Sequence, residues 1–163
     1  MINKQDLIQQ FGLQMHPEGG YFTETYRSNR VIERDRDGQQ RTLLTSIYYL
    51  LTDDRPIDYF HVNQSDTIHY FHAGSAVNYL VLDPNGTLQK FKLGINIAKG
   101  ETPQLLVPAG SWKAAYLEEG EFGLLGEAVA PGFEYHDMKI AEPETFRQQF
   151  PDLWDQLAPY VKQ

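Results

Sequence analysis

The stretch FHVNQSDTIHYFHAG, residues 60–74, holds three of the five histidines in this chain of 163 residues. Its short runs of aromatic, Val, Ile and Thr residues, separated by polar residues, are typical of β-strands. Side chains alternate between the faces of a strand, so His61 and Asn63 are expected on one side. His69 and His72, three residues apart, are expected on opposite faces. The stretch therefore predicts strands with a polar face, and not a three-histidine metal site.

Similar short runs fill most of the chain from residue 19 to residue 130, and each is bounded by Gly, Pro, Asn or Asp. Residues 83–86, Asp-Pro-Asn-Gly, have the composition of a tight hairpin turn. The charged segment 33–41 contains no apolar residue and is predicted to be an exposed hairpin tip or loop. Nine or ten short strands without helices between them favour an antiparallel sandwich or barrel over a βαβ fold.

The two ends of the chain have helical patterns instead. Apolar residues recur at helical spacing between Asn3 and Leu13, with Asn3 as N-cap and Gly12 as stop signal. After Ala141, two short helices broken at Pro151 are predicted to cover an end or a face of the β part. We expect one domain over residues 1–163, composed of an N-terminal helix (1–14), a β-barrel (15–141) and a helical tail (142–163).

Composition and charge exclude several classes of protein. The net charge of −8 and the pI of about 5.0 oppose attraction to nucleic acid or to anionic lipids. The chain has no cysteine, so disulfides, thiolate metal sites and cysteine nucleophiles are excluded. The N-terminus lacks a signal-peptide pattern, and no window is apolar enough for a membrane span. We expect a soluble cytoplasmic protein without nucleic-acid or membrane partners.

Common catalytic patterns do not explain the histidines. Ser65, Asp66 and His69 lie close together, but no G-x-S-x-G elbow is present to raise a serine nucleophile. No P-loop or dinucleotide-binding glycine motif follows a strand. Each histidine taken alone is as well explained by burial among aromatic residues with one hydrogen bond. Their clustering in one segment favours a polar pocket.

With its flanks, the same stretch resembles the first motif of the cupin superfamily, in which H-x-H is followed by a Glu and then a Gly. These four positions hold His61, Asn63, Thr67 and Gly74. VPAGSWKAAY, residues 107–116, resembles the second motif, with Pro108 and Gly110 in register and Lys113 in the histidine position. The resemblance implies that the barrel is kept while the metal ligands have been replaced.

A longer resemblance is to the fifth cupin family, long described as a domain of unknown function. It rests on HPEGGYFTETYRS (16–28), SIYYLL (46–51), residues 60–74, PQLLVPAGSWKAA (103–115) and LLGEAVAPGFEYHDMKIA (124–141). It implies an all-β double-stranded β-helix, the RmlC-like jelly roll, and a homodimer that covers exposed strand edges. The metal positions would be His61, Asn63, Thr67 and Lys113, of which one is a good ligand, so we expect neither metal nor other cofactor.

If the barrel closes as the resemblance implies, its polar interior is formed by His61, Asn63, Thr67, His69, Lys113 and Glu127. Lys113 would pair there with Glu127 or an anionic ligand, unless a bulge turns it to solvent. Tyr48 and Tyr26 are among the tyrosines that could stack on a sugar or base. His16 and Glu18 border the cavity mouth or lie on a surface loop.

Two functions of different class follow. The first is metal-independent binding of a small polar, anionic or sugar-like metabolite. The second is a metal-independent sugar-nucleotide epimerase or isomerase, in which His61 or His69 removes a proton, a tyrosine returns it and Lys113 stabilises the oxyanion. A third hypothesis is an interaction or structural protein with a vestigial cavity.

Overall fold

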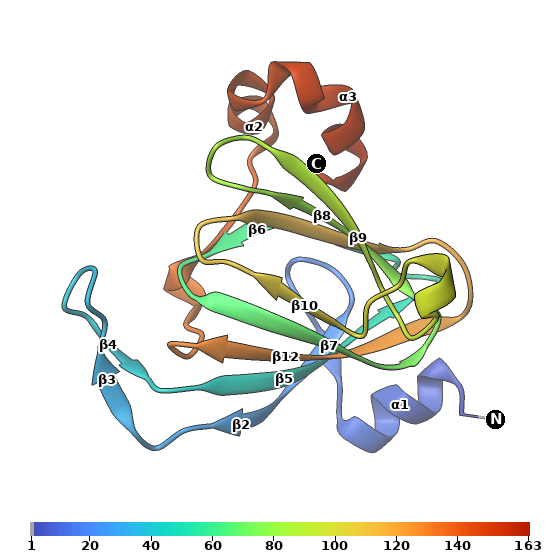
Figure 1. The fold of residues 1–163 in the computed structure, drawn as a ribbon. Coiled ribbons are helices and arrows are strands. Elements are labelled where there is room, and N and C mark those ends of the chain that lie inside the picture. Colours follow the sequence, from blue (N-terminus) through green and yellow to red (C-terminus); the bar gives the residue numbers. More distant parts are fainter. Residues whose placement is uncertain (1) are drawn as a thin grey trace.

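Two antiparallel sheets face each other and enclose the core of the protein (Figure 1). The computed structural model describes residues 2–163. One sheet has the order β1 (Gln14–Met15), β2 (Tyr21–Arg27), β5 (Thr45–Thr52), β12 (Phe122–Ala130), β7 (Asp66–Gly74) and β10 (Gln104–Val107). The other has the order β13 (Met138–Ile140), β6 (Ile57–Asn63), β11 (Trp112–Leu117), β8 (Val77–Leu82) and β9 (Leu88–Leu93). The predicted all-β jelly-roll barrel is confirmed.

The deeper part of the space between the sheets is filled by apolar side chains from both of them. Leu51 and Leu125 come from the six-stranded sheet, and Val77, Tyr79 and Val81 come from the other. These residues alternate along their strands with residues of the outer faces, as the pleat requires. This apolar cluster does not fill the part of the lumen beside β6, which leaves room there for polar side chains.

The N-terminal helix covers the outer face of the six-stranded sheet. Helix α1 (Lys4–Phe11) begins after Asn3, which forms a capping box with Asp6, and ends at Gly12 in the left-handed conformation. Leu7 of α1 packs with Leu13, Leu50 and Leu124 in a second apolar cluster. The predicted helix, its cap and its stop are confirmed.

The C-terminal tail covers the outer face of the five-stranded sheet, where it forms a separate layer (Figure 1). It consists of α2 (Pro143–Gln149), η3 (Pro151–Leu153), α3 (Trp154–Leu157) and η4 (Ala158–Tyr160), and the predicted break at Pro151 is confirmed. Phe146 and Leu157 pack against Phe60 and Leu80, whose side chains point out of the barrel. Because the tail buries this face, the side chains that point out of these strands are apolar. No helix within residues 2–163 has the length and apolar content needed to cross a bilayer.

Two hairpins were predicted from turn composition and charge. The turn at residues 83–86 joins β8 to β9 and is confirmed. The charged segment forms the hairpin of β3 (Val31–Glu33) and β4 (Gln40–Thr42), but its expected exposure is wrong for Arg34 and Arg41, which are buried. The Arg41 guanidinium is held by two hydrogen bonds to Asp137, in the short helix η2 (Tyr135–Asp137). Paired in this way, a guanidinium can be buried without an unsatisfied charge.

Two β-bulges decide which side chains reach the lumen. The pairing of β6 with β11 shifts by one residue, so that Lys113 lies opposite His61 while Ala115 lies opposite Asp58. The extra residue in β6 changes the phase of the alternation, and Asp58 faces the lumen together with His61. A second shift, between β2 and β5, turns Arg27 inward together with Glu24.

The loop between β1 and β2 folds tightly onto β6. Gly19 and Gly20 both have positive φ, 120° and 63°, and a Cβ on Gly19 would lie 1.9 Å from the carbonyl oxygen of Ile57. The carbonyl oxygen of Glu18 accepts a hydrogen bond of 2.8 Å from the backbone N–H of Tyr59. Two glycines are thus what allows this loop to bring His16 and Glu18 against the barrel interior.

The remaining short helix, η1 (Ile97–Lys99), lies between β9 and β10.

We predict that Gly19→Ala destabilises the protein by about 3 kcal/mol or more, because the new methyl group meets backbone atoms and the required φ is unfavourable. Gly100→Ala is the matched control: its φ is 78°, but nothing lies within 4 Å of the added methyl group. The control should cost about 1 kcal/mol. Urea denaturation of both variants measures the difference. An equal decrease in the free energy of unfolding would show that the close approach to Ile57 does not affect stability.

Candidate functional site

A cavity with both polar and apolar lining opens beside β6. It encloses about 670 Å³ of empty space, which includes open solvent at its mouth, and is lined by β2, β5, β6, β12 and the segments before β2 and after β12. The polar lining contains His16, Glu18, Glu24, Arg27, Thr45, His61, Asn63, Glu127 and Glu134, and the apolar lining includes Phe22, Ile47, Tyr49, Val129, Phe133 and Tyr135. This mixed lining is typical of a site for a small molecule.

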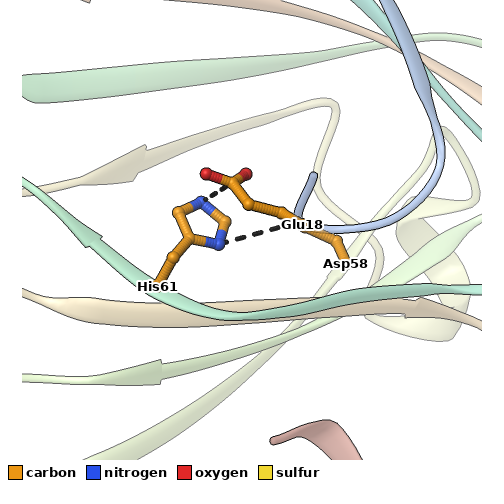
Figure 2. A group of neighbouring side chains, drawn as sticks. All are labelled: Glu18, Asp58 and His61. Atoms are coloured by element: carbon orange, nitrogen blue, oxygen red, sulfur yellow. Dashed lines mark ion pairs between the residues drawn. The ribbon is translucent and has the colours of Figure 1, made fainter. Parts of the chain in front are cut away.

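The floor of the cavity is centred on Glu18 and His61. Oε2 of Glu18 lies 3.1 Å from Nε2 of His61 and 3.4 Å from Nδ1 of His16. On the other side of the ring, Nδ1 of His61 lies 2.7 Å from the carbonyl oxygen of Tyr59 and 3.6 Å from Oδ1 of Asp58. Figure 2 shows the carboxyl group of Glu18 at one nitrogen of the imidazole and a dashed line that runs from the other nitrogen toward Asp58. Glu18, Asp58 and His61 are all buried.

Behind the floor, the ammonium group of Lys113 is enclosed by carboxylates. Its Nζ lies 3.3 Å from Oδ2 of Asp58 and 3.6 Å from Oε1 of Glu127, and its side chain is 4% exposed. Glu127 also lies 3.2 Å from Nδ1 of His69, which in turn contacts the Tyr79 hydroxyl at 3.2 Å. Lys113 and His69 do not line the cavity, so a ligand there would meet Glu127 and not the lysine.

Burial and mutual charge set the protonation of these groups. Burial alone lowers the pKa of Lys113, but Asp58, Glu127 and Glu18 outweigh it, so the pKa lies above its ordinary value. Burial alone raises the pKa of Glu127, but Lys113 outweighs it and the pKa lies below the usual range. The pKa of Glu18 is raised and not lowered. Burial is the larger cause and the charge of Asp58 the second, and together they hold this pKa well above 4.5. Burial likewise raises the pKa of Asp58, against the attraction of Lys113.

The three buried histidines are neutral at physiological pH. Burial lowers the pKa of His61 to about 3, with Lys113 adding to the shift. It lowers the pKa of His16 to about 4, and that of His69 also falls, chiefly by burial. The floor therefore contains one ammonium ion, neutral imidazoles, and carboxyl groups that outnumber the cations.

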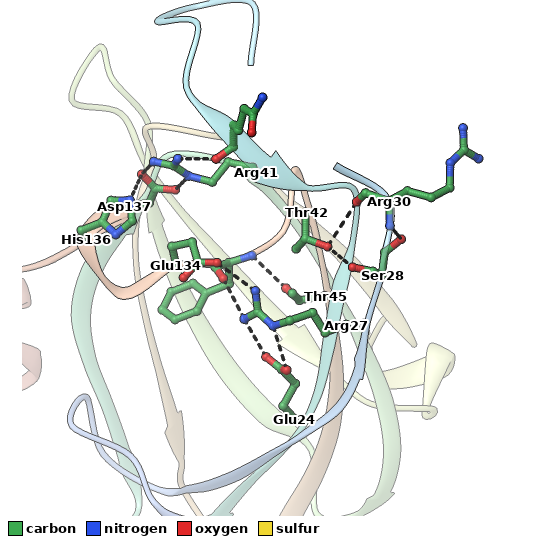
Figure 3. Close-up of polar contacts among 12 residues, drawn as sticks. Glu24, Arg27, Ser28, Arg30, Arg41, Thr42, Thr45, Glu134, His136 and Asp137 are labelled. Atoms are coloured by element: carbon green, nitrogen blue, oxygen red, sulfur yellow. Dashed lines mark hydrogen bonds and ion pairs between the residues drawn. The ribbon is translucent and has the colours of Figure 1, made fainter. Parts of the chain in front are cut away.

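At the mouth, Arg27 joins β2 to the segment that follows β12 (Figure 3). It makes two hydrogen bonds to Glu24, of 3.0 and 2.9 Å, one to Glu134, of 2.9 Å, and one to the carbonyl oxygen of Phe133, of 3.2 Å. The backbone N–H of Phe133 donates to the Thr45 hydroxyl at 2.9 Å. Arg27 is thus already occupied, and its guanidinium is not free to bind an anion.

The residues expected inside the barrel do not all reach the cavity. Asn63, His61 and Glu127 line it, while His69 and Lys113 lie behind the floor and Thr67 is buried beside Val107 and Val129. Tyr48 lies on the outer face, with its ring 4.9 Å from that of Phe11, and Tyr26 is 52% exposed. Tyr49, one residue further along β5, points inward in place of Tyr48.

The sequence missed Asp58 and placed Glu18 and His16 only at a cavity mouth or on a surface. Asp58 lies three residues before His61, and strict alternation would have put it on the opposite face. A β-bulge cannot be located from one sequence, so no available signal would have found it. The pair of glycines after Glu18 was a usable signal, because it indicates a close approach of two backbones.

The positions that hold a metal in other cupins do not fit one here. Asn63, Thr67 and Lys113 replace three of the four ligands, and the lysine ammonium is paired with Asp58 and Glu127. Glu18, Asp58 and His61 bring possible ligand atoms within 4.8 Å of one another. However, Nδ1 of His61 faces a carbonyl oxygen and Asp58 faces the ammonium, so Nε2 of His61 and the Glu18 carboxyl are the two donors of this group left for an ion. The donor set argues against a resident metal ion.

This arrangement of two antiparallel sheets around a polar lumen defines a cupin-type barrel. A model of the family described as Cupin superfamily (DUF985) matches residues 5–141. The chain belongs to this family, and the resemblance inferred from its motifs is confirmed. The uncharacterized protein YML079W of Saccharomyces cerevisiae is 39% identical over 153 residues, covering 86% of this chain and 76% of the yeast protein.

Solved structures agree with this assignment. A hypothetical protein from Leishmania major has a TM-score of 0.93 at 25% identity, over 99% of this chain and 100% of the other. Protein SO0799 from Shewanella oneidensis has a TM-score of 0.91 at 31% identity, over 99% of each chain. A variant of Bacillus subtilis oxalate decarboxylase has a TM-score of 0.55 at 16% identity, over 84% of this chain and 34% of that one, and shares the fold.

We predict that Lys113→Met lowers the free energy of unfolding by about 3–5 kcal/mol at neutral pH, because it leaves buried carboxylates without their cation. Lys99→Met, at an exposed lysine, should change it by less than about 0.5 kcal/mol. Adding Asp58→Asn to Lys113→Met should restore part of the loss. Denaturant titrations measure all three variants. A Lys113→Met protein as stable as the native one would show that the ammonium does not balance the carboxyl groups.

Proposed function

We propose that the protein binds a small, polar, sugar-like metabolite in the cavity, without a metal ion. The observation that carries the proposal is the surplus of hydrogen-bond acceptors at the floor. Oδ1 of Asn63 is buried without a hydrogen-bond partner among residues 2–163. The Glu127 carboxylate and the Glu18 carboxyl line the same cavity. Unpaired acceptors are costly to bury, so a ligand rich in hydroxyl groups gains by supplying the missing donors.

Binding is better supported than epimerisation. A proton abstracted from carbon needs a free base, but Nε2 of His61 faces Glu18 and His69 is fully buried behind the floor. The inward tyrosines are equally occupied, since the Tyr49 hydroxyl donates to the carbonyl oxygen of Gly19 at 2.6 Å and Tyr79 contacts His69. Lys113 is shielded from the cavity by Asp58 and Glu127, where it could not stabilise an oxyanion. The homodimer and the cytoplasmic location remain predictions.

The first test is binding of D-fructose, D-glucitol and myo-inositol, measured by saturation-transfer NMR on the full chain. We expect at least one of these compounds to bind, and Asn63→Ala to weaken it by about tenfold, the effect of losing one buried hydrogen bond. Asn78→Ala is the matched control, because Asn78 contacts Glu118 and not the cavity. No binding of any of the three would contradict the proposal.

The same samples, kept in D₂O, test the alternative. Deuterium incorporation at carbon in D-fructose, abolished in His61→Ala, would favour an enzyme over a binding protein. Binding without incorporation supports the proposal.

The second test is the metal content of protein purified without a histidine tag. We expect iron, manganese, nickel and zinc all to be far below stoichiometric, and the melting temperature to be the same before and after treatment with a chelator. Removal of a resident metal would lower the stability of the barrel, because its binding energy contributes to folding. Near-stoichiometric metal would overturn the metal-free proposal.

A further inference from the structure

We propose that Glu18 and His61 share one proton, that Glu18 is thereby a neutral carboxylic acid at the cavity floor, and that the cavity takes an uncharged polyhydroxy compound in preference to an anion. The ligand class rests on the binding function proposed above. The shared proton does not, since it can be measured in the free protein.

The tautomer of His61 follows from its contact with the main chain. Nδ1 lies 2.7 Å from the carbonyl oxygen of Tyr59. A carbonyl oxygen can only accept a hydrogen bond, so Nδ1 must carry the hydrogen. In a neutral imidazole the other nitrogen, Nε2, then has a lone pair and no hydrogen.

That nitrogen lies next to Glu18. Nε2 is 3.1 Å from Oε2 of Glu18, within hydrogen-bond distance, and both side chains are more than nine-tenths buried. A carboxylate oxygen and an unprotonated nitrogen would repel each other at this separation. The contact becomes a hydrogen bond when one proton lies between the two atoms. The geometry therefore requires the pair to hold one proton more than a neutral imidazole and a carboxylate.

The surroundings place this proton on the carboxyl group. An imidazolium ion at His61 would lie in a barrel that already encloses the Lys113 ammonium, and both it and the resulting carboxylate would be desolvated. The neutral pair avoids two buried charges. The pKa directions agree, since burial lowers the pKa of His61 to about 3 and raises that of Glu18 well above 4.5.

The second oxygen of Glu18 gives the ligand class. Figure 2 marks the contact between one carboxyl oxygen of Glu18 and the imidazole, and this oxygen is Oε2. Oε1 makes no hydrogen bond or ion pair with the residues that the structure describes. With the proton held toward His61, Oε1 is a neutral acceptor, as is the unpartnered Oδ1 of Asn63. Two neutral acceptors in one cavity fit two hydroxyl groups of one molecule, and neither of them compensates a charge.

An anionic ligand is disfavoured by the same floor. It would find the nearest cations, Arg27 and Lys113, already paired with carboxylates. The negative charge of the ligand would therefore remain uncompensated in a largely enclosed site.

The shared proton makes the site sensitive to alkaline pH. A carboxyl group whose pKa is raised in the folded state contributes stability below its unfolded pKa, near 4.5, and loses it as pH rises through the folded pKa. The titratable groups that face Glu18 come from every surrounding element: His16, Tyr49, Asp58, His61, Lys113, Glu127 and Tyr135. Of these, Asp58 and Glu127 oppose ionisation of Glu18, and Lys113 favours it.

The proton is tested with Glu18→Gln, whose amide can donate to Nε2 and accept at Oε1 in the same positions. Infrared difference spectra of the free protein at pH 7 should show the carbonyl band of a protonated carboxyl group in the native protein and in the control Glu24→Gln, but not in Glu18→Gln. Nitrogen NMR should show His61 as the neutral tautomer with hydrogen on Nδ1. An imidazolium signal for His61, or no protonated carboxyl band, would overturn the proposal.

Thermal melts supply a second readout. Replacing a neutral acid by an amide removes the alkaline loss of stability, so the melting temperature of Glu18→Gln relative to native should increase from pH 5 to pH 9. Glu24→Gln should show no such trend of increase. If Glu18 were instead a carboxylate paired with an imidazolium, Glu18→Gln would melt well below native protein at pH 7, which would contradict the shared proton.

The ligand class is tested with two matched compounds at pH 7: D-glucitol and D-glucitol 6-phosphate. D-glucitol should bind at least about tenfold more tightly than the phosphate, as expected when a ligand brings uncompensated negative charge into a buried site. Tighter binding of the phosphate would overturn the ligand class. A protonated Glu18 together with no binding of either compound would refute the proposed function but leave the shared proton standing.

Discussion

The ammonium group of Lys113 is the fixed charge to which the rest of the lumen is adjusted. A lysine this deeply buried is stable only if carboxylates surround it, and Asp58 and Glu127 do so at 3.3 and 3.6 Å. Those carboxylates in turn need the cation, so removing either the ammonium or its carboxylate partners alone would leave an unpaired buried charge. Burial lowers the pKa of His61 and of His69, and the nearby ammonium adds to this effect, so both imidazoles are neutral. Glu18, which has no cation of its own, is left to hold a proton.

A cupin barrel that relies on an ammonium ion differs from one that binds a metal in how its groups are directed. A metal ion draws neutral imidazoles and carboxylates to one point along their lone pairs. An ammonium ion donates hydrogen bonds and leaves the histidines to find other partners. His61 accordingly donates to the carbonyl oxygen of Tyr59, and His69 lies against Glu127 and Tyr79. Restoring a metal site would thus require more than exchanging Lys113 for histidine, because His61 is already oriented by other contacts.

The sequence predicted the fold well because its signals are local and repeated. Alternation, turn composition and the two helical ends each pointed to the same barrel, and each was confirmed where the structure tests it. The site was harder to predict, because it depends on which of two successive residues in a strand points into the lumen. Asp58 faces the lumen through a bulge, and the choice between Tyr48 and Tyr49 could not be made when both faces of β5 are covered. Arg34 and Arg41 were expected on the surface, since charge alone does not reveal a distant carboxylate such as Asp137.

The two cations at the cavity are paired in different ways, and together they restrict what can bind there. The charge of Lys113 is neutralised by Asp58 and Glu127, whose buried side chains a ligand cannot displace without unfolding the barrel. Arg27 is neutralised at the mouth by Glu24 and Glu134, where both partners are partly exposed and an ion pair is weak. A ligand can therefore enter by moving the Arg27 contacts, at a cost of about 1 kcal/mol for each exposed pair. It then meets a floor whose one ammonium ion is already paired, so hydrogen bonding rather than attraction to a cation decides how tightly it is held.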